Sequence, residues 1–87
     1  MKLKYEFAIS EVAGETVAVS VGTNGRNMVV GLNGSAELLF RLLMEGAESD
    51  ALIAALVDKY EGLDEATARA DAEEFVSALR LRELLEE

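Results

Sequence analysis

The side chains best suited to chemistry in this sequence are carboxylates near its C-terminal end. Asp71, Glu73 and Glu74 lie close together, and three-residue spacing places Asp71 and Glu74 on one face of a helix. Paired carboxylates can act as general acid and base or bind Mg²⁺ and Ca²⁺. The sequence lacks an Asp-x-Asp-x-Asp-Gly calcium loop, however, so a solvated acidic face is the favoured interpretation.

Other reactive groups are missing from the composition. The chain has no His and no Cys, which removes the commonest general base, the thiol nucleophile and most metal-ligand sets. The segment from Gly22 to Gly25 lacks the lysine and following helix of a phosphate-binding loop. We therefore expect no catalytic residue, no metal site and no cofactor, and a binding protein in place of an enzyme.

The charge distribution excludes one class of partner. The formal net charge is −9, and all of it falls in residues 33–87. Because such a surface repels phosphate backbones, nucleic acid is not an expected partner. The acidic surface fits either a solvated face or a basic protein partner.

The 87 residues suffice for one small core, so we expect a single domain over residues 1–87. Neither a secretory signal nor a membrane-spanning run is visible in the sequence, and we expect a cytoplasmic protein with no membrane contact.

Hydrophobic periodicity then predicts the elements that position these groups. Tyr5, Phe7 and Ile9 alternate with mostly polar residues, as in a half-buried strand. Asn24-Gly25 favours a tight reversal between two further strands. The expected strands are about 4–10, 16–21 and 27–32, and the expected helices are about 34–45, 49–61 and 65–85. This order predicts an α+β fold with a three-stranded antiparallel meander followed by three helices.

Polar residues and glycines mark the helix ends. Asn33-Gly34-Ser35, Ser49 and Asp64 can cap the three helix starts. Gly46 and Gly62 are expected to end the first two helices.

The third strand, residues 27–32, contains neither charge nor proline. Edge strands normally carry such protection against further pairing. Either a helix or a dimer mate covers this strand, or it accepts an extended peptide as an additional strand.

The sequence resembles the PqqD family, especially its stand-alone members found beside radical SAM peptide maturases. Three motifs carry the resemblance: Phe7-Ala8-Ile9-Ser10-Glu11-Val12-Ala13-Gly14-Glu15, the helix opening Leu32-Asn33, and the closing helix from Asp71 to Leu79. The resemblance as a whole covers about residues 5–85.

The resemblance implies a winged helix-turn-helix-like domain that recognises the leader of a ribosomally made precursor peptide and presents it to a modifying enzyme, here a radical SAM maturase. The leader would add as a strand to the third strand and lie against the third helix. The matching residues are Asn27, Met28, Val29, Val30 and Gly31 at the edge, and Asp71, Glu74, Phe75 and Ala78 in the groove. An aromatic on a helical apolar stripe, such as Phe75, is more often a core residue than a ligand contact.

The sequence departs from the family pattern at three places. Val19-Ser20-Val21 replaces a Val-Pro pair, Phe40 stands where Trp is common, and Arg82-Glu83-Leu84 lacks a Gly near the end. These departures leave the subfamily open.

Three functions therefore fit the sequence. The favoured one is a peptide-binding adaptor. The second is a winged-helix DNA-binding or regulatory domain, against which the third helix carries five acids around Arg69 alone: Asp64, Glu65, Asp71, Glu73 and Glu74. The third is a structural module that forms a homodimer through the third strand.

Overall fold

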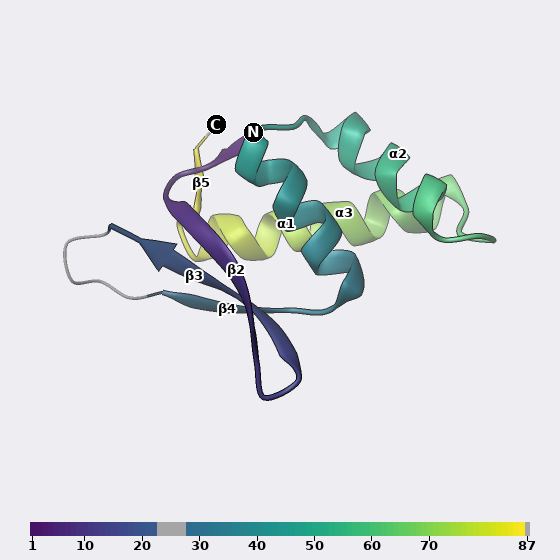
Figure 1. The fold of residues 1–87 in the computed structure, drawn as a ribbon. Coiled ribbons are helices and arrows are strands. Elements are labelled where there is room, and N and C mark those ends of the chain that lie inside the picture. Colours follow the sequence, from purple (N-terminus) through teal and green to yellow (C-terminus); the bar gives the residue numbers. More distant parts are fainter. Residues whose placement is uncertain (23–27, 87) are drawn as a thin grey trace.

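The described residues contain a three-stranded antiparallel sheet followed by three helices, in the order that the periodicity predicts. The computed structural model describes residues 1–22 and 28–86. The sheet has the order β2-β3-β4, and two shorter strands, β1 and β5, pair with each other (Figure 1). The elements are β1 (Lys2–Leu3), β2 (Glu6–Val12), β3 (Glu15–Val21), β4 (Val29–Leu32), α1 (Gly34–Glu45), α2 (Ser49–Lys59), α3 (Glu65–Leu81) and β5 (Leu85–Glu86). The expected α+β class with a meander followed by helices is confirmed.

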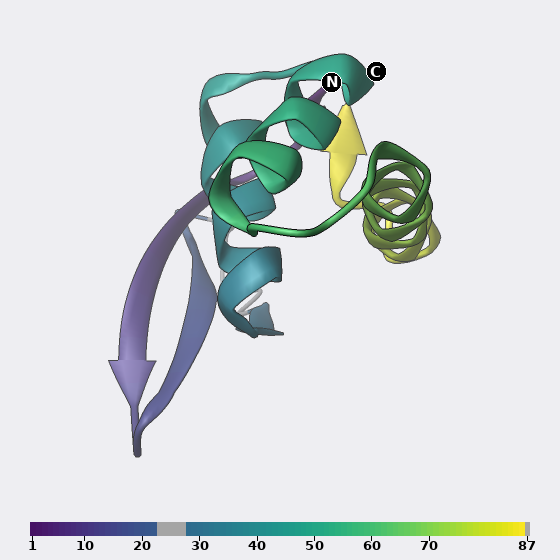
Figure 2. The same cartoon turned by 90° about the vertical axis from the view of Figure 1, so that its right-hand side faces the viewer.

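The hairpin of β2 and β3 turns within two residues. Ala13 and Gly14 have φ values of 53° and 81°, the left-handed pair typical of a type I′ turn. This turn sets the register, in which Val12 faces Glu15 and Phe7 faces Ser20. The end of the hairpin projects well away from the helices (Figure 2). The expected reversal at Asn24-Gly25 lies outside the described residues.

The inner face of β3 is made by small residues. Ala18 and Ser20 are buried, whereas Val17 and Val19 are half-buried and Val21 is exposed. Because side chains alternate along a strand, the valines lie on the outer face of the sheet. The inner face is thereby left with room for a large aromatic ring from α1.

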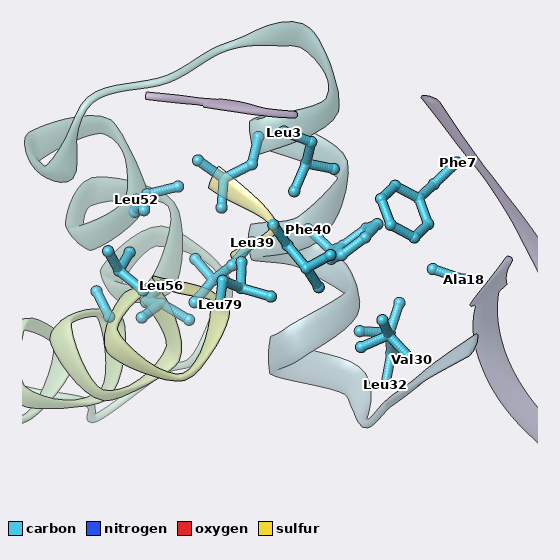
Figure 3. Packing of buried hydrophobic residues seen from close by; sticks show 14 of the residues in the cluster. Leu3, Phe7, Ala18, Val30, Leu32, Leu39, Phe40, Leu52, Leu56 and Leu79 are labelled. Atoms are coloured by element: carbon cyan, nitrogen blue, oxygen red, sulfur yellow. The ribbon is translucent and has the colours of Figure 1, made fainter. Parts of the chain in front are cut away.

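Helix α1 lies between the sheet and the other two helices and divides the core into two parts (Figure 3). On the sheet side, the rings of Phe7 and Phe40 meet edge to face with centroids 5.1 Å apart. On the helical side, Leu52 and Leu56 of α2 pack toward Leu79 of α3. Phe40 is fully buried, so this aromatic of α1 is a core residue.

Two of the three expected caps are confirmed. Asn33 Oδ1 accepts from the Ala36 N–H at 2.8 Å, and Asp64 Oδ1 accepts from the Thr67 N–H at 2.7 Å. The latter hydrogen bond to the backbone lowers the pKa of Asp64. The expected cap at Ser49 is wrong. Glu48 holds the cap position, and its carboxylate binds the Met1 amino group at 2.9 Å.

The third helix ends earlier than expected, at Leu81 in place of residue 85. The Leu84 N–H donates to Leu79 O at 3.0 Å and the Glu83 N–H to Arg80 O at 2.9 Å, which together form a Schellman motif. Glu83 takes the left-handed conformation, with φ of 57°, which Gly adopts more readily than other residues.

The residues beyond the Schellman motif form β5, which pairs with β1 so that Lys2 faces Glu86. The two ends of the chain therefore lie side by side (Figure 1). The first strand of the meander also differs from expectation, since β2 runs from Glu6 to Val12 rather than over residues 4–10. Among residues 1–22 and 28–86, every helix is too short or too polar to cross a bilayer.

Candidate functional site

Strand β4 presents backbone groups at an edge of the sheet. The Ser20 N–H donates to Met28 O at 3.0 Å, so this pair is a hydrogen-bonded pair of the ladder. Bonded and non-bonded pairs alternate along an antiparallel ladder. With Val30 facing Ala18 and Gly31 facing Val17, the N–H and C=O groups of Val29 and Gly31 must point away from β3. These groups form the row that an added strand would use.

The expected edge residues differ in how far their side chains are exposed. Val29 and Gly31 are exposed, and Met28 is half-buried with its N–H bound to Ser20 Oγ at 2.8 Å. Val30 is buried in the core, where its side chain cannot meet a ligand. Asn27 lies outside the described residues. Within the described part, the edge is therefore narrower than the range predicted from the sequence.

A groove of about 350 Å³ opens between the start of α1 and the middle of α3. Because α1 follows β4 directly, the groove begins where the strand ends. Its walls come from α1, α2 and α3, through Asn33, Ser35, Ala36, Leu39, Leu56, Asp71, Glu74, Phe75 and Ala78.

All four residues expected on the α3 side line this groove. Asp71, Glu74 and Ala78 are exposed, and Phe75 is half-buried. Phe75 thus packs partly against the core and partly faces the groove. The four-residue spacing from Asp71 to Phe75, and three more to Ala78, follows one face of the helix.

Helix α3 also reaches the edge of β4. Arg82, just after the last residue of α3, donates from Nη2 to Val29 O at 3.4 Å, across 53 positions of sequence. The end of α3 therefore lies beside the start of β4, and its middle lies beside the start of α1. The edge thus leads into the groove at Asn33, which follows β4 and lines the groove, and we call the edge and the groove together the β4–α3 trough.

Sequence reasoning missed two parts of this trough. Asn33, Ser35 and Ala36 were interpreted only as a helix start, although the same residues line the groove. Arg82 carried no signal at all, because its contact with Val29 depends on how α3 crosses the sheet. Neither contribution follows from a local sequence pattern.

The chemistry of the trough is that of a binding surface. It combines main-chain donors and acceptors, an apolar floor that includes Leu39 and Phe75, and two carboxylates. Across residues 1–22 and 28–86, nowhere do three acidic side chains gather as a metal site would require. The arrangement suits an extended peptide.

Two of three comparisons place the chain among known proteins. The family model of coenzyme PQQ synthesis protein D (PqqD) matches residues 15–85. The fold is similar to that of TbiB1 in complex with the TbiA(beta) leader peptide, with a TM-score of 0.73, 27% identity, and coverage of 99% of this chain and 95% of that chain. None of the curated protein sequences compared with it matches.

A second solved structure has the same fold. It is lasso peptide synthetase B1 complexed with the leader peptide, with a TM-score of 0.71, 21% identity, and coverage of 99% of this chain and 96% of that chain. The family match begins at Glu15. The N-terminal motif from Phe7 onward, which contributed to the expected resemblance, therefore lies outside it apart from its last residue.

Proposed function

Because the chain belongs to the PqqD family, we propose that it binds the leader segment of a ribosomally synthesised precursor peptide and presents it to a modifying enzyme. In this proposal the leader adds to β4 as a fourth strand and lies in the β4–α3 trough. The binding mode is strand addition to an exposed sheet edge.

The observation that carries the proposal is the outward row of backbone groups at Val29 and Gly31. Each main-chain hydrogen bond to the added strand contributes a net of about 0.5–1.5 kcal/mol. The similarity to TbiB1, whose structure was solved in complex with a leader peptide, supports the same use of this fold.

The groove along α3 would supply selectivity. Alternate residues of an added strand face opposite sides of the sheet, so every second leader side chain would face α3. An apolar residue would contact Phe75 and Ala78, and a Lys or Arg would meet Asp71 or Glu74. The main-chain bonds would give affinity to any extended peptide, and these contacts would choose among sequences.

The protein itself would perform no chemistry. The trough holds carboxylates but the chain has neither His nor Cys, and a binding role needs neither. The modifying enzyme that receives the leader is, in our proposal, a radical SAM maturase, as the resemblance to stand-alone members of the family suggests.

A pair of proline variants tests the proposal. Proline removes a backbone N–H and is tolerated at sheet edges. Val29→Pro removes an outward N–H from the β4 edge. Its matched control is Glu11→Pro on β2. The two-residue turn makes Val12 and Glu15 a hydrogen-bonded pair, and the alternation of bonded and non-bonded pairs then leaves the Glu11 N–H facing away from β3.

The measurement is the dissociation constant for the leader region of a precursor peptide encoded beside the gene. We expect Val29→Pro to weaken binding about tenfold or more, since it removes one main-chain bond and disturbs its neighbours. Glu11→Pro should bind as the parent protein does. Equal affinities of all three proteins would overturn strand addition at β4, and a concentration-dependent mass near twice 9.4 kDa would favour a dimer through this edge.

A further inference from the structure

We propose that Arg82 occupies the β4 edge in the free protein and, when displaced, selects a peptide with an acidic side chain at one fixed position. The inference rests on the proposed function, because it concerns the same trough. It names a residue that would choose among peptides, and it predicts the charge pattern of the peptide that binds.

The backbone at Arg82 is held firmly in place. The Schellman motif fixes the chain on its C-terminal side, and Leu84 within it is 1% exposed. The Lys4 N–H donates to Leu84 O at 2.8 Å and ties this segment to the start of the sheet. The exposed side chain of Arg82 therefore projects toward β4 from an anchored position.

The acceptor that Arg82 contacts is one that an added strand needs. Val29 O belongs to the outward row of the ladder, and Arg82 Nη2 lies 3.4 Å from it. That distance is longer than an ordinary N–H···O bond, so the contact is weak enough to exchange. A peptide N–H that binds Val29 O must displace the guanidinium, which then stands beside the new strand.

A displaced guanidinium has a clear preference among peptide side chains. Its planar fork of N–H donors matches the two oxygens of a carboxylate. Elsewhere the trough carries Asp71 and Glu74, which repel an acidic side chain. A peptide carboxylate is consequently favoured only at the Arg82 end.

The distance between Arg82 and Glu74 predicts how far apart the charged residues of the peptide should be. Arg82 and Glu74 are eight residues apart, which corresponds to about 12 Å along a helix. An extended strand covers that distance in about four residues at roughly 3.3 Å each. Residues four apart share one face of a strand, so the expected peptide carries an acidic and a basic residue about four positions apart, both facing α3.

The test selects peptides from a displayed library of random decapeptides. The baits are the unmodified protein, Arg82→Gln and the control Arg69→Gln, which removes the same charge from α3 at a residue paired with Glu65. We expect the unmodified protein and the control to enrich one acidic position, and Arg82→Gln to enrich the same peptides without it. Selection indifferent to acids in all three would overturn the inference alone. Failure of every bait to enrich any peptide would overturn the proposed function as well.

Affinities for individual peptides then show whether Arg82 selects the peptide or only stabilises the fold. For a selected peptide and its acid-to-Ala variant, the unmodified protein should prefer the acidic peptide about two- to fivefold, as is typical of an exposed ion pair. Arg82→Gln should show a ratio near one and bind the Ala peptide more tightly than the unmodified protein does, because Val29 O is free. Arg82→Lys should fall between. A residue that only stabilised the fold would weaken both peptides alike, and that result would contradict the inference.

Discussion

The sheet has two edges, and they differ in what protects them. Strand β2 carries Glu6 and Glu11 within its own seven residues, and charged residues discourage pairing with another strand. Strand β4 has four residues and no charge. Its protection comes from Arg82 at the end of a distant helix. The β2 edge is thus closed by its own sequence, and the β4 edge by a contact that a ligand can replace.

The two edges also differ in what lies beside them. Both edges leave a row of backbone groups unpaired, so the hydrogen-bonding capacity is similar. Strand β4 adjoins a groove, because α1 follows it and lines the groove together with α3. The candidate binding edge therefore differs from the β2 edge both in its own lack of charge and in the helix beside it.

The largest effect is expected from a substitution in the core of α1, which supports both edges of the sheet. Phe40 is fully buried and contacts Phe7 of β2, so Phe40→Ala should cost about 3–5 kcal/mol of unfolding free energy. A domain of this size has about 5–15 kcal/mol in total. Urea denaturation followed by circular dichroism measures the loss. A cost below about 1 kcal/mol would show that α1 does not hold the sheet in place.

A smaller effect, on leader affinity, is expected to distinguish the groove-lining face of α3 from its other exposed residues. Ala78 lines the groove and its neighbour Ser77 is exposed outside it. Ala78→Leu should fill the groove and weaken leader binding about tenfold, as for a blocked contact worth roughly 1–2 kcal/mol. Ser77→Leu, which adds a similar side chain, should leave the affinity unchanged. Titration calorimetry of both variants checks this, and equal losses would remove the groove from the binding site.

The smallest effect concerns the turn that holds Arg82. Glu83 has φ of 57°, a conformation that disfavours residues with a Cβ and suits Gly. Glu83→Gly should therefore stabilise the protein by about 1 kcal/mol. The control Glu73→Gly in the interior of α3 should destabilise it by a similar amount. Thermal unfolding measures both, and destabilisation by both variants would contradict the Schellman geometry.

Local patterns predicted most of the fold, and long-range geometry accounts for the rest. The caps at Asn33 and Asp64 could be predicted because each depends on residues within one helical turn. The early end of α3 was missed because Leu85 and Glu86 prefer to pair with β1 at the other end of the chain. Which face of β3 is buried depends on its packing against α1, and the structure buries the small Ala18 and Ser20 while Val21 is exposed.

The candidate site divides in the same way. Asp71, Glu74, Phe75 and Ala78 were placed by family resemblance, and all four line one groove. Val30 was placed at the edge by the same resemblance, and the structure buries its side chain. Which face of a four-residue strand is buried depends on the helix packed against it, and the strand's own residues are apolar on both faces.

Hydrogen exchange of individual amides tests directly whether the leader adds to β4 as a strand. Adding the leader peptide should slow exchange at the outward amides of Val29 and Gly31, because they become bonded to the new strand. The outward amides of Ile9 and Glu11 on β2 should exchange at unchanged rates. Protection confined to β2, or peptide binding with no added protection at Val29 and Gly31, would contradict strand addition at β4.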